Sequence, residues 1–390
     1  MSFSADTGMA EAMTLGVKRK SARSDGKARA VFVVLDDRPS MPLDGYAVAD
    51  AIRKSITAHG LRTIEDVPVG GTAIRIGDDI VGHAIEAPLR QDRTWDVCRV
   101  VDLALAQTAW RLIESGTLWL PGMPAAHPTN LPLDTIGNMI AHIGPYHADI
   151  DWNGSNGAVR GPFARRPTQS PSTVTYPILW AHDADRERSI CFEADTEGVE
   201  RPGRTDEEIE KVREKVSAVQ ASASHLHFNQ NFQFNSQSTA MQYTKRRTIG
   251  GRAWMTIRFA EPAMEAAVAL WGNTTLGLLL HWWQANKQQG GRGNVGKEAL
   301  ATFSCLDPAR LTQAQRTDSA KLLKKVAGVA MRPLNEIAED VARAELDRAF
   351  LGGILGLPDS LFADGGPLEL LRRKLAAEPS VHGNKRKVAP

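Results

Sequence analysis

The chain has 390 residues, of which 42% are hydrophobic and 24% charged, and a formal net charge of +2. These ordinary values indicate a soluble globular protein of two or three domains and exclude a polycation, so any nucleic-acid surface has to come from local clustering of charge. Cys98, Cys191 and Cys305 are too far apart for a disulfide scaffold or a zinc site, which favours a reducing, cytoplasmic environment. No apolar run reaches the roughly 18–20 residues that span a bilayer, so we expect no membrane contact.

The N-terminal part of the chain predicts a small α/β region behind a tail. Residues 1–28 are small, polar and basic without hydrophobic periodicity, so we expect disorder there. Residues 30–35, AVFVVL, are a continuous apolar run typical of a buried strand. The next predicted elements are a helix over 46–59 that Gly60 ends, short strands over 61–89, and a helix over 95–114 that Gly116 ends.

Proline and glycine residues over 121–132 mark the main predicted boundary. Thr205 is expected to cap a charged helix, with Glu208 three positions later completing a capping box. Other features of this part are a polar loop over 153–172 and predicted strands over 175–182 and 188–194.

These elements together predict an α+β fold. Its expected parts are a disordered basic tail (1–28), a region with the remnant of a mixed sheet (29–120), an α/β domain (130–306), a helical region (307–377) and a tail (378–390).

The segment from 245 to 304 is the most basic substantial part of the folded chain. It reads as a strand, KRRTIGGRAWMTIRF, an apolar helix, ALWGNTTLGLLLHWWQANK, and a Gly-rich basic loop that begins GGRGNVGK. Lys and Arg side chains supply non-specific affinity for DNA, and backbone amides of a Gly-rich loop approach phosphates closely. A solvated face with a flexible loop is the alternative interpretation. The candidate DNA-binding residues here are Lys245, Arg246, Arg247, Arg252, Arg292, Asn294 and Lys297.

A dense run of carboxamides surrounds Phe228, Phe232 and Phe234. If this run is a strand, the phenylalanines lie on one face, and Gln233 and Asn235 lie on the other. Asn and Gln pair bidentately with adenine in the major groove, so both amides are candidate DNA-binding residues. The alternative is a polar strand that faces solvent or a partner subunit. Four tryptophans nearby are expected in the core rather than stacked on a base: Trp254, Trp271, Trp282 and Trp283.

Several catalytic signatures are absent from the sequence. It contains no GxxxxGK[ST], GxSxG or HExxH motif, and no GxGxxG that follows a predicted strand. Asp36 and Asp37 follow the AVFVVL strand, where they would serve as a metal-binding pair or, alternatively, cap a helix or turn. The Asn/Asp-Pro-Pro-aromatic motif holds the flipped adenine in N6-adenine methyltransferases. This motif does not occur in the sequence.

Short segments over residues 30–385 nevertheless resemble, in order, the C-terminal target-recognition half of N6-adenine DNA methyltransferases from restriction–modification and phage-defence systems. Gly272 and Thr274 depart from the family's pattern, and its methyl-donor half has no counterpart here. The similar segments are RAVFVVLDDRP, IESGTLWLPG, IGNMIAHIGPYHADIDW, GPF, TYPILWAHDADRERSI, SQSTAMQYTKRRTIGGRAWMTIRF, ALWGNTTLGLLL, RAELDRAFLGGILGLP and AEPSVHGNK.

The resemblance implies a non-catalytic specificity subunit that recognises double-stranded DNA while a catalytic methyltransferase subunit binds S-adenosylmethionine. It implies no cofactor and no metal on this chain. The partner would dock on the N-terminal region, where AVFVVL could extend the partner's sheet by edge addition. Two alternatives remain open: a structural adaptor in a defence complex without DNA contact, and a metal-dependent hydrolase that uses Asp36, Asp37 and histidines.

Overall fold

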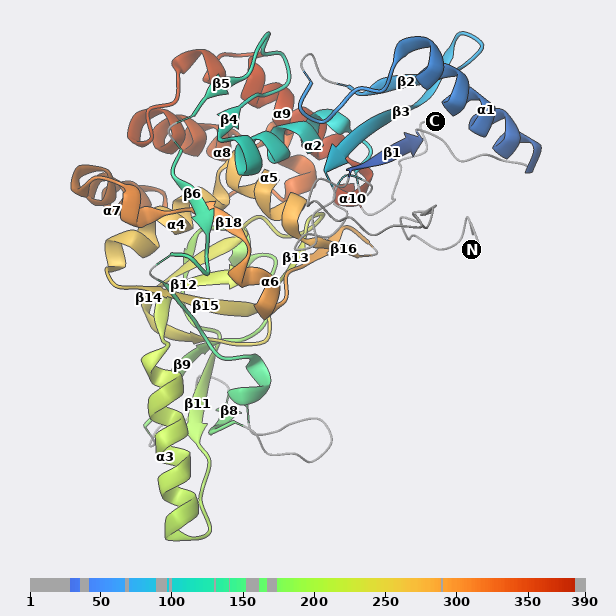
Figure 1. Ribbon diagram of the computed structural model, residues 1–390. Coiled ribbons are helices and arrows are strands. Elements are labelled where there is room, and N and C mark those ends of the chain that lie inside the picture. Colours follow the sequence, from blue (N-terminus) through green and yellow to red (C-terminus); the bar gives the residue numbers. More distant parts are fainter. Residues whose placement is uncertain are drawn as a thin grey trace. The chain divides into compact units, whose positions relative to one another are not determined.

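The computed structural model describes residues 29–35, 42–66, 70–88, 97, 100–129, 131–139, 141–151, 161–166, 174–288 and 290–382. The chain divides into two compact units. One comprises Met1–Thr129, Gln289–Gly291 and Asp364–Pro390, and the other comprises Asn130–Gln288 and Arg292–Ala363. Both contain helices and strands, so the predicted α+β class is confirmed (Figure 1).

The first unit contains a three-stranded sheet in the order β1-β3-β2. Its named strands pair antiparallel, and a single bridge between Thr63 and Glu86 is parallel. The helix α1 packs on one face through an apolar cluster that includes Ala51, Ile74 and Ala84. The elements of this unit are β1 (Arg29–Leu35), α1 (Pro42–His59), β2 (Thr72–Ile76), β3 (Asp79–Pro88), α2 (Leu103–Trp110), β4 (Thr117–Leu118), β5 (His127–Pro128), α9 (Pro367–Ala377) and α10 (Pro379–His382).

The strand β1 is not the fully buried strand that its apolar run predicts. It lies at an edge of the sheet and, among the described strands, pairs only with β3. Phe32 and Val34 are buried, whereas Val31 and Val33 are 49% and 36% exposed. This alternation is typical of an antiparallel edge strand with one covered face. The first unit therefore presents an apolar strand edge among its described residues.

The helix expected over 95–114 begins later than predicted. Asp102 is its N-cap and accepts a hydrogen bond from the Ala104 amide. The buried Glu378 carboxylate accepts from the amides of Val101 and Asp102, which holds this start in place. A π-helical turn, Arg111–Ser115, continues α2 as far as Gly116, whose φ of 60° ends the helix as predicted. Residues 378–382, expected in a tail, form this contact and α10 instead.

The second unit is built on an eight-stranded sheet with the order β7-β15-β12-β14-β9-β11-β8, in which β10 also pairs with β14. The sheet is mixed, because β14 pairs antiparallel with β12 and parallel with β9. Its strands are β7 (Ala141–Ile143), β8 (Phe163–Arg166), β9 (Tyr176–Leu179), β10 (Cys191–Phe192), β11 (Thr196–Glu200), β12 (Ser224–Asn229), β14 (Met241–Gly250) and β15 (Trp254–Phe259). The polar loop predicted over 153–172 thus contains a strand, β8.

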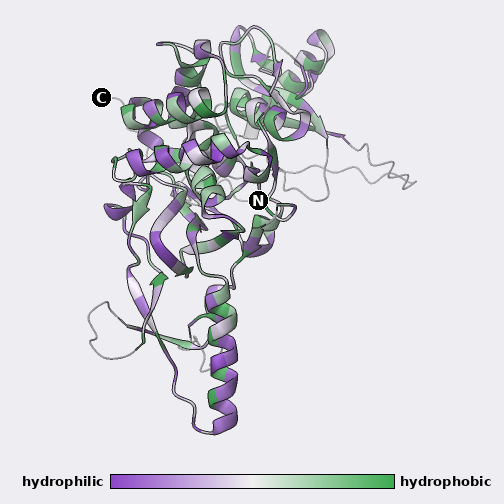
Figure 2. Ribbon diagram, turned by 90° about the vertical axis from the view of Figure 1, so that its left-hand side faces the viewer, coloured by the Kyte–Doolittle hydropathy of each residue, from purple (hydrophilic) through white to green (hydrophobic). Residues whose placement is uncertain are grey.

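The helix α3 (Asp206–Ala221) begins where the sequence predicts. Thr205 accepts a hydrogen bond from the Glu208 amide, but the Glu208 carboxylate accepts from the Arg204 amide instead of closing the capping box on Thr205. Its apolar side joins a cluster with residues of β8, β9 and β14. The remainder of the helix is strongly hydrophilic (Figure 2).

Two apolar helices, α4 (Pro262–Asn273) and α5 (Thr275–Gln284), form much of the hydrophobic core of the second unit. All four tryptophans named above are at most 3% exposed, as expected for core residues. Gly272 and Thr274, which differ from the pattern of the methyltransferases that the sequence resembles, have local structural roles. A Cβ at Gly272 would lie 2.5 Å from Met241 Cγ, and Thr274 caps α5 by accepting from the Gly277 amide.

The C-terminal helices are divided between the units, with α7 and α8 in the second and α9 and α10 in the first. The domain boundaries expected from sequence stay a prediction. Within the described residues, no single helix is long and apolar enough to cross a membrane. The other elements of the second unit are β6 (Leu133–Thr135), β13 (Asn231–Gln233), β16 (Asn286–Gln288), β17 (Arg292–Asn294), α6 (Lys297–Ala301), β18 (Ser304–Leu306), α7 (Gln313–Val326) and α8 (Val341–Asp347).

Candidate nucleic-acid interface

Three consecutive cations protrude from the middle of β14, and we call Lys245–Arg247 the cationic bulge. Tyr243 lies opposite Leu226 of β12, and Thr248 lies opposite Ser224. Four residues of β14 therefore face the single intervening residue of β12, so the strand has to bulge there. Lys245, Arg246 and Arg247 are all exposed.

Two buried threonines hold the backbone of this bulge. The hydroxyl groups of Thr244 and Thr248 donate to the Arg246 carbonyl over 2.8 and 2.9 Å. Both threonines are 1% exposed. The exposed cations are therefore carried by a backbone that the core fixes, which limits the conformational entropy lost when a ligand binds.

The charges of the bulge are mostly uncompensated within the described part of the chain. Lys245 Nζ lies 3.3 Å from Glu193 Oε1, with both side chains more than half exposed. Such surface pairs contribute little stability. Arg246 and Arg247 form no ion pair with another described residue. Two guanidinium groups thus remain available to an anionic partner.

Arg252 lies apart from the bulge, in the turn between β14 and β15, and is exposed. Burial and the positive charge of Arg252 both lower the pKa of His147. The guanidinium of Arg165 lies 4.1 Å from the Trp180 ring centre and is held by Asp151.

The small antiparallel sheet β13-β17-β16 carries a second polar surface. One row across its strands is Asn231, Asn294 and Asn286, and the next is Gln233, Arg292 and Gln288. Because alternate residues of a strand share a face, both rows lie on the same side of the sheet. We call these six residues the amide face. Asn286, Gln288 and Arg292 are exposed, and the other three are partly buried.

Hydrogen bonds link several of these side chains. Arg292 Nε donates to Gln233 Oε1 over 3.0 Å, and Gln233 Nε2 donates to Asn235 Oδ1 over 2.9 Å. Asn294 Nδ2 donates to Asn231 Oδ1 over 2.6 Å. The structure therefore brings four predicted site residues together: Gln233, Asn235, Arg292 and Asn294.

The opposite side of this sheet is anchored in the core. Phe232 and Phe234 are fully buried with ring centres 5.2 Å apart, whereas Gln233 and Asn235 are partly buried. Because β13 ends at Gln233, the alternation predicted for a strand is confirmed for Phe232 and Gln233, while Phe234 and Asn235 lie in the turn that follows. A Cβ at Gly293 would lie 2.5 Å from Phe234 Cζ. The prediction of a Gly-rich loop is thus wrong in part. Arg292–Asn294 is a strand packed on the core, and Lys297 begins α6. Lys297 itself is exposed.

Other amides of the same sequence run are structural. Asn229 and Gln242 are fully buried, and Gln237 is 3% exposed. Gln237 Oε1 accepts from Asn229 Nδ2 and from the Gln233 amide, which fixes the connection between β12 and β13. Their burial excludes direct contact with a base.

Asn286 and Gln288 were not among the residues singled out from sequence. The signal was the pattern NKQQGGRGN, in which a Gly-Gly turn separates two short alternating segments and so favours a β-hairpin. Recognising that hairpin would have placed both amides beside Arg292 and Asn294. The role of all these residues in DNA binding stays a prediction.

The alternative of a metal-dependent hydrolase gains no site among the described residues. No group of three or more His, Cys, Asp or Glu there could hold a metal ion. Burial is the main cause that lowers the pKa of His227 and of His281 to about 3. Asp36 and Asp37 lie outside the residues that the structure describes.

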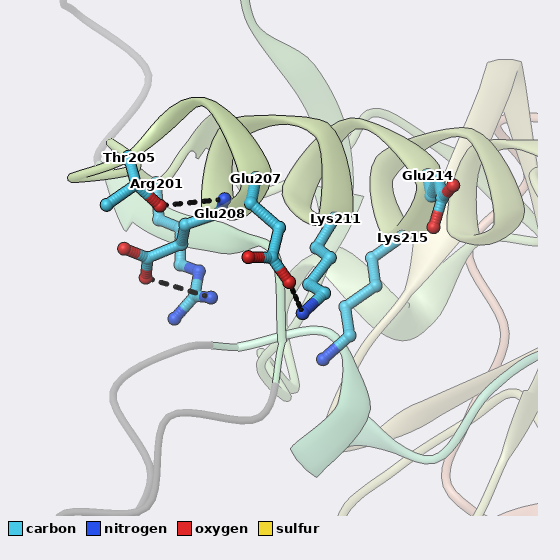
Figure 3. Close-up of a pocket in the computed structure, with 7 residues that line it drawn as sticks. All are labelled: Arg201, Thr205, Glu207, Glu208, Lys211, Glu214 and Lys215. Atoms are coloured by element: carbon cyan, nitrogen blue, oxygen red, sulfur yellow. Dashed lines mark hydrogen bonds and ion pairs between the residues drawn. The ribbon is translucent and has the colours of Figure 1, made fainter.

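A shallow depression along α3 is lined by acidic and basic side chains that largely pair with one another (Figure 3). Lys211 Nζ lies 2.6 Å from Glu207 Oε1, and Arg201 Nη2 lies 3.5 Å from Glu208 Oε1. These pairs are what the solvated face of a charged helix forms. The depression therefore offers no concentrated charge to a ligand.

No protein-family model and no curated protein matches the chain. A similar solved structure is that of the type IIG restriction endonuclease BpuSI, with 9% identity and a TM-score of 0.40. The match covers 89% of this chain and 39% of that one. The similarity to a restriction enzyme is coarse.

Proposed function

We propose that the second unit binds double-stranded DNA. The observation that carries the proposal is the cationic bulge, in which Arg246 and Arg247 are exposed and unpaired with any other described residue. Duplex DNA is a dense polyanion, and cations that neutralise its phosphates release condensed counterions, which drives binding. A bulge held by buried threonines presents these cations at fixed positions, as phosphate contacts that set the register of a protein on DNA require.

We further propose that the chain is the recognition subunit of a split N6-adenine DNA methyltransferase, within a restriction–modification or phage-defence complex. The ordered segments that resemble the recognition half of such enzymes support this role, as does the absence of the adenine-holding motif from the sequence. In this arrangement S-adenosylmethionine and the methyl-transfer step belong to a catalytic partner subunit.

The edge of β1 is the surface that we assign to that partner. Val31 and Val33 are exposed residues of β1, which pairs with β3 on one side only among the described strands. An exposed apolar edge strand is prone to pair with another chain, and adding a strand to a sheet gives main-chain hydrogen bonds along its length.

The test of DNA binding reverses two charges of the bulge. In fluorescence anisotropy titrations with a labelled 30-base-pair duplex at low salt, Arg246→Glu with Arg247→Glu is expected to weaken binding by about tenfold or more. The matched control is Lys324→Glu with Lys325→Glu, which changes the same number of charges at exposed positions of α7 in the same unit. It should reduce affinity much less.

Equal losses in the two double variants would attribute binding to total charge and refute the assignment to the bulge. Absence of binding by the unmodified chain, together with co-purification of a partner protein, would replace the proposal by a structural adaptor role.

A further inference from the structure

We propose that the amide face reads base edges in the major groove, with its carboxamides directed to adenine and Arg292 to guanine. This inference rests on the proposed binding of DNA and assigns its sequence-reading element. It adds Asn231, Asn286 and Gln288 to the residues considered for contact with bases.

The composition of the amide face suits contact with base edges. Five of the six side chains on the amide face are Asn or Gln, the sixth is Arg, and none is acidic or apolar. Asn and Gln bind adenine bidentately through N6 and N7, and Arg binds guanine through O6 and N7. A carboxylate-free surface also avoids repulsion by the neighbouring phosphates.

The hairpin that carries the exposed part of the amide face has a size that suits the major groove. Strands lie about 4.8 Å apart, so three adjacent strands are about 14 Å wide, whereas the major groove is about 12 Å wide and admits a two-stranded ribbon. The hairpin of β16 and β17 therefore enters the groove, and β13 lies at its rim. The two rows are two residues apart along each strand, or about 6.7 Å, close to two base-pair steps of 3.4 Å. One face of this sheet therefore matches a footprint of roughly three to four base pairs. Strands in the major groove are an established mode of recognition.

The amide face is held rigidly. The reverse side of the sheet packs through Phe232 and Gly293, and Lys287 Nζ lies over the Trp282 ring at 4.6 Å. On the amide face, the Gln233 carboxamide is fixed by Arg292 Nε and by Asn235. Bidentate recognition of guanine uses two donors of the guanidinium fork, and the bond from Nε leaves the two Nη groups for that purpose. Groups that are already oriented lose less entropy on binding.

The experiment selects duplexes from a library with a randomised ten-base-pair core, using the full chain together with any partner that co-purifies. Selected and scrambled duplexes are then compared in competition titrations. The unmodified chain should enrich a short motif that contains guanine and adenine. Arg292→Ala should lose preference at the guanine, and Asn286→Ala with Gln288→Ala should lose preference at adenine, each by about tenfold or more in the ratio of affinities.

The control is Gln313→Ala, an exposed carboxamide on α7 in the same unit, which should keep the full preference. Affinity for scrambled duplex reports non-specific binding and should fall little in the amide-face variants. Retained melting temperatures would show that the variants are folded.

Separate outcomes identify which statement fails. If the amide-face variants keep the motif and its affinity ratio while reversal of Arg246 and Arg247 still weakens binding, the reading element is wrong and the proposed function stands. Enrichment without any preferred motif would likewise overturn the inference. If the unmodified chain retains no duplex at low salt, both proposals are refuted.

Discussion

Lowering the pH should destabilise the second unit through two histidines that the fold keeps neutral. His281 is 1% exposed and stacks on Phe228 with ring centres 4.8 Å apart. The rings of Phe232 and Phe303 meet it edge-on, and neither ring nitrogen has a hydrogen-bond partner among the described residues. An imidazolium placed there would be a buried, unpaired charge, which explains why burial lowers the pKa of His281 to about 3.

The sign of the effect follows from proton linkage. An unfolded histidine has a pKa of about 6.5, so below that pH the unfolded chain binds a proton that the folded chain excludes until about pH 3. Stability is therefore complete above about pH 6.5 and falls as the pH decreases towards 3. From pH 7.5 to about pH 5.5 the loss is roughly one pKa unit, or between about 1 and 2 kcal/mol, for each such histidine. His227, fully buried with its pKa also lowered to about 3, should contribute a similar loss.

Urea denaturation at pH 7.5 and 5.5 measures this loss. His281→Phe keeps an aromatic ring in the stack and removes the titrating group, so its loss between the two pH values should be smaller by between about 1 and 2 kcal/mol. His142→Gln removes an exposed imidazole and serves as the control. An undiminished pH dependence in His281→Phe would refute the reasoning, whatever the absolute stability of that variant.

Three further predictions concern the core and the edge strand. Asn273 Oδ1 accepts from the Ala240 amide, and its Nδ2 donates to two carbonyls. Asn273→Ala should therefore lower the free energy of unfolding, measured by urea denaturation, by about 2–4 kcal/mol. A decrease below about 1 kcal/mol would contradict this role. A Cβ at Gly277 would lie 2.0 Å from the Trp271 carbonyl oxygen, so Gly277→Ala should lower the melting temperature sharply, whereas Gly328→Ala, in open space, should not. When the chain is co-expressed with the genes that neighbour its own, Val33→Lys should no longer co-purify with a catalytic subunit. Val329→Lys changes a valine of similar exposure and should still co-purify with it. Equal co-purification by both variants would refute the assignment of β1 as the docking edge.

Local signals in the sequence were sufficient to place several elements. Gly60 ends α1 with a φ of 71°, and Thr205 caps α3, because both effects depend on residues within one helical turn. The alternation of phenylalanines and amides also placed Phe232 and Phe234 inward and Gln233 outward correctly.

What the sequence did not indicate depends on partners that are distant along the chain. The start of α2 is set partly by Glu378, which lies 276 positions after Asp102. Spacing alone could not show that Asn229 and Gln242 are buried, because their hydrogen-bond partners become neighbours only in the folded sheet. The same holds for the rows of the amide face, which depend on the register of β13 against β17.

The most direct test of the account is the salt dependence of DNA binding by the unmodified chain and by Arg246→Gln with Arg247→Gln. The slope of log K against log salt concentration counts the phosphates that the protein neutralises, at about 0.9 per phosphate. Removing two phosphate contacts should make the slope shallower by about 2, while the neutral control Lys324→Gln with Lys325→Gln leaves it unchanged. Identical slopes for the unmodified chain and the Arg246 and Arg247 variant would contradict DNA binding through the cationic bulge.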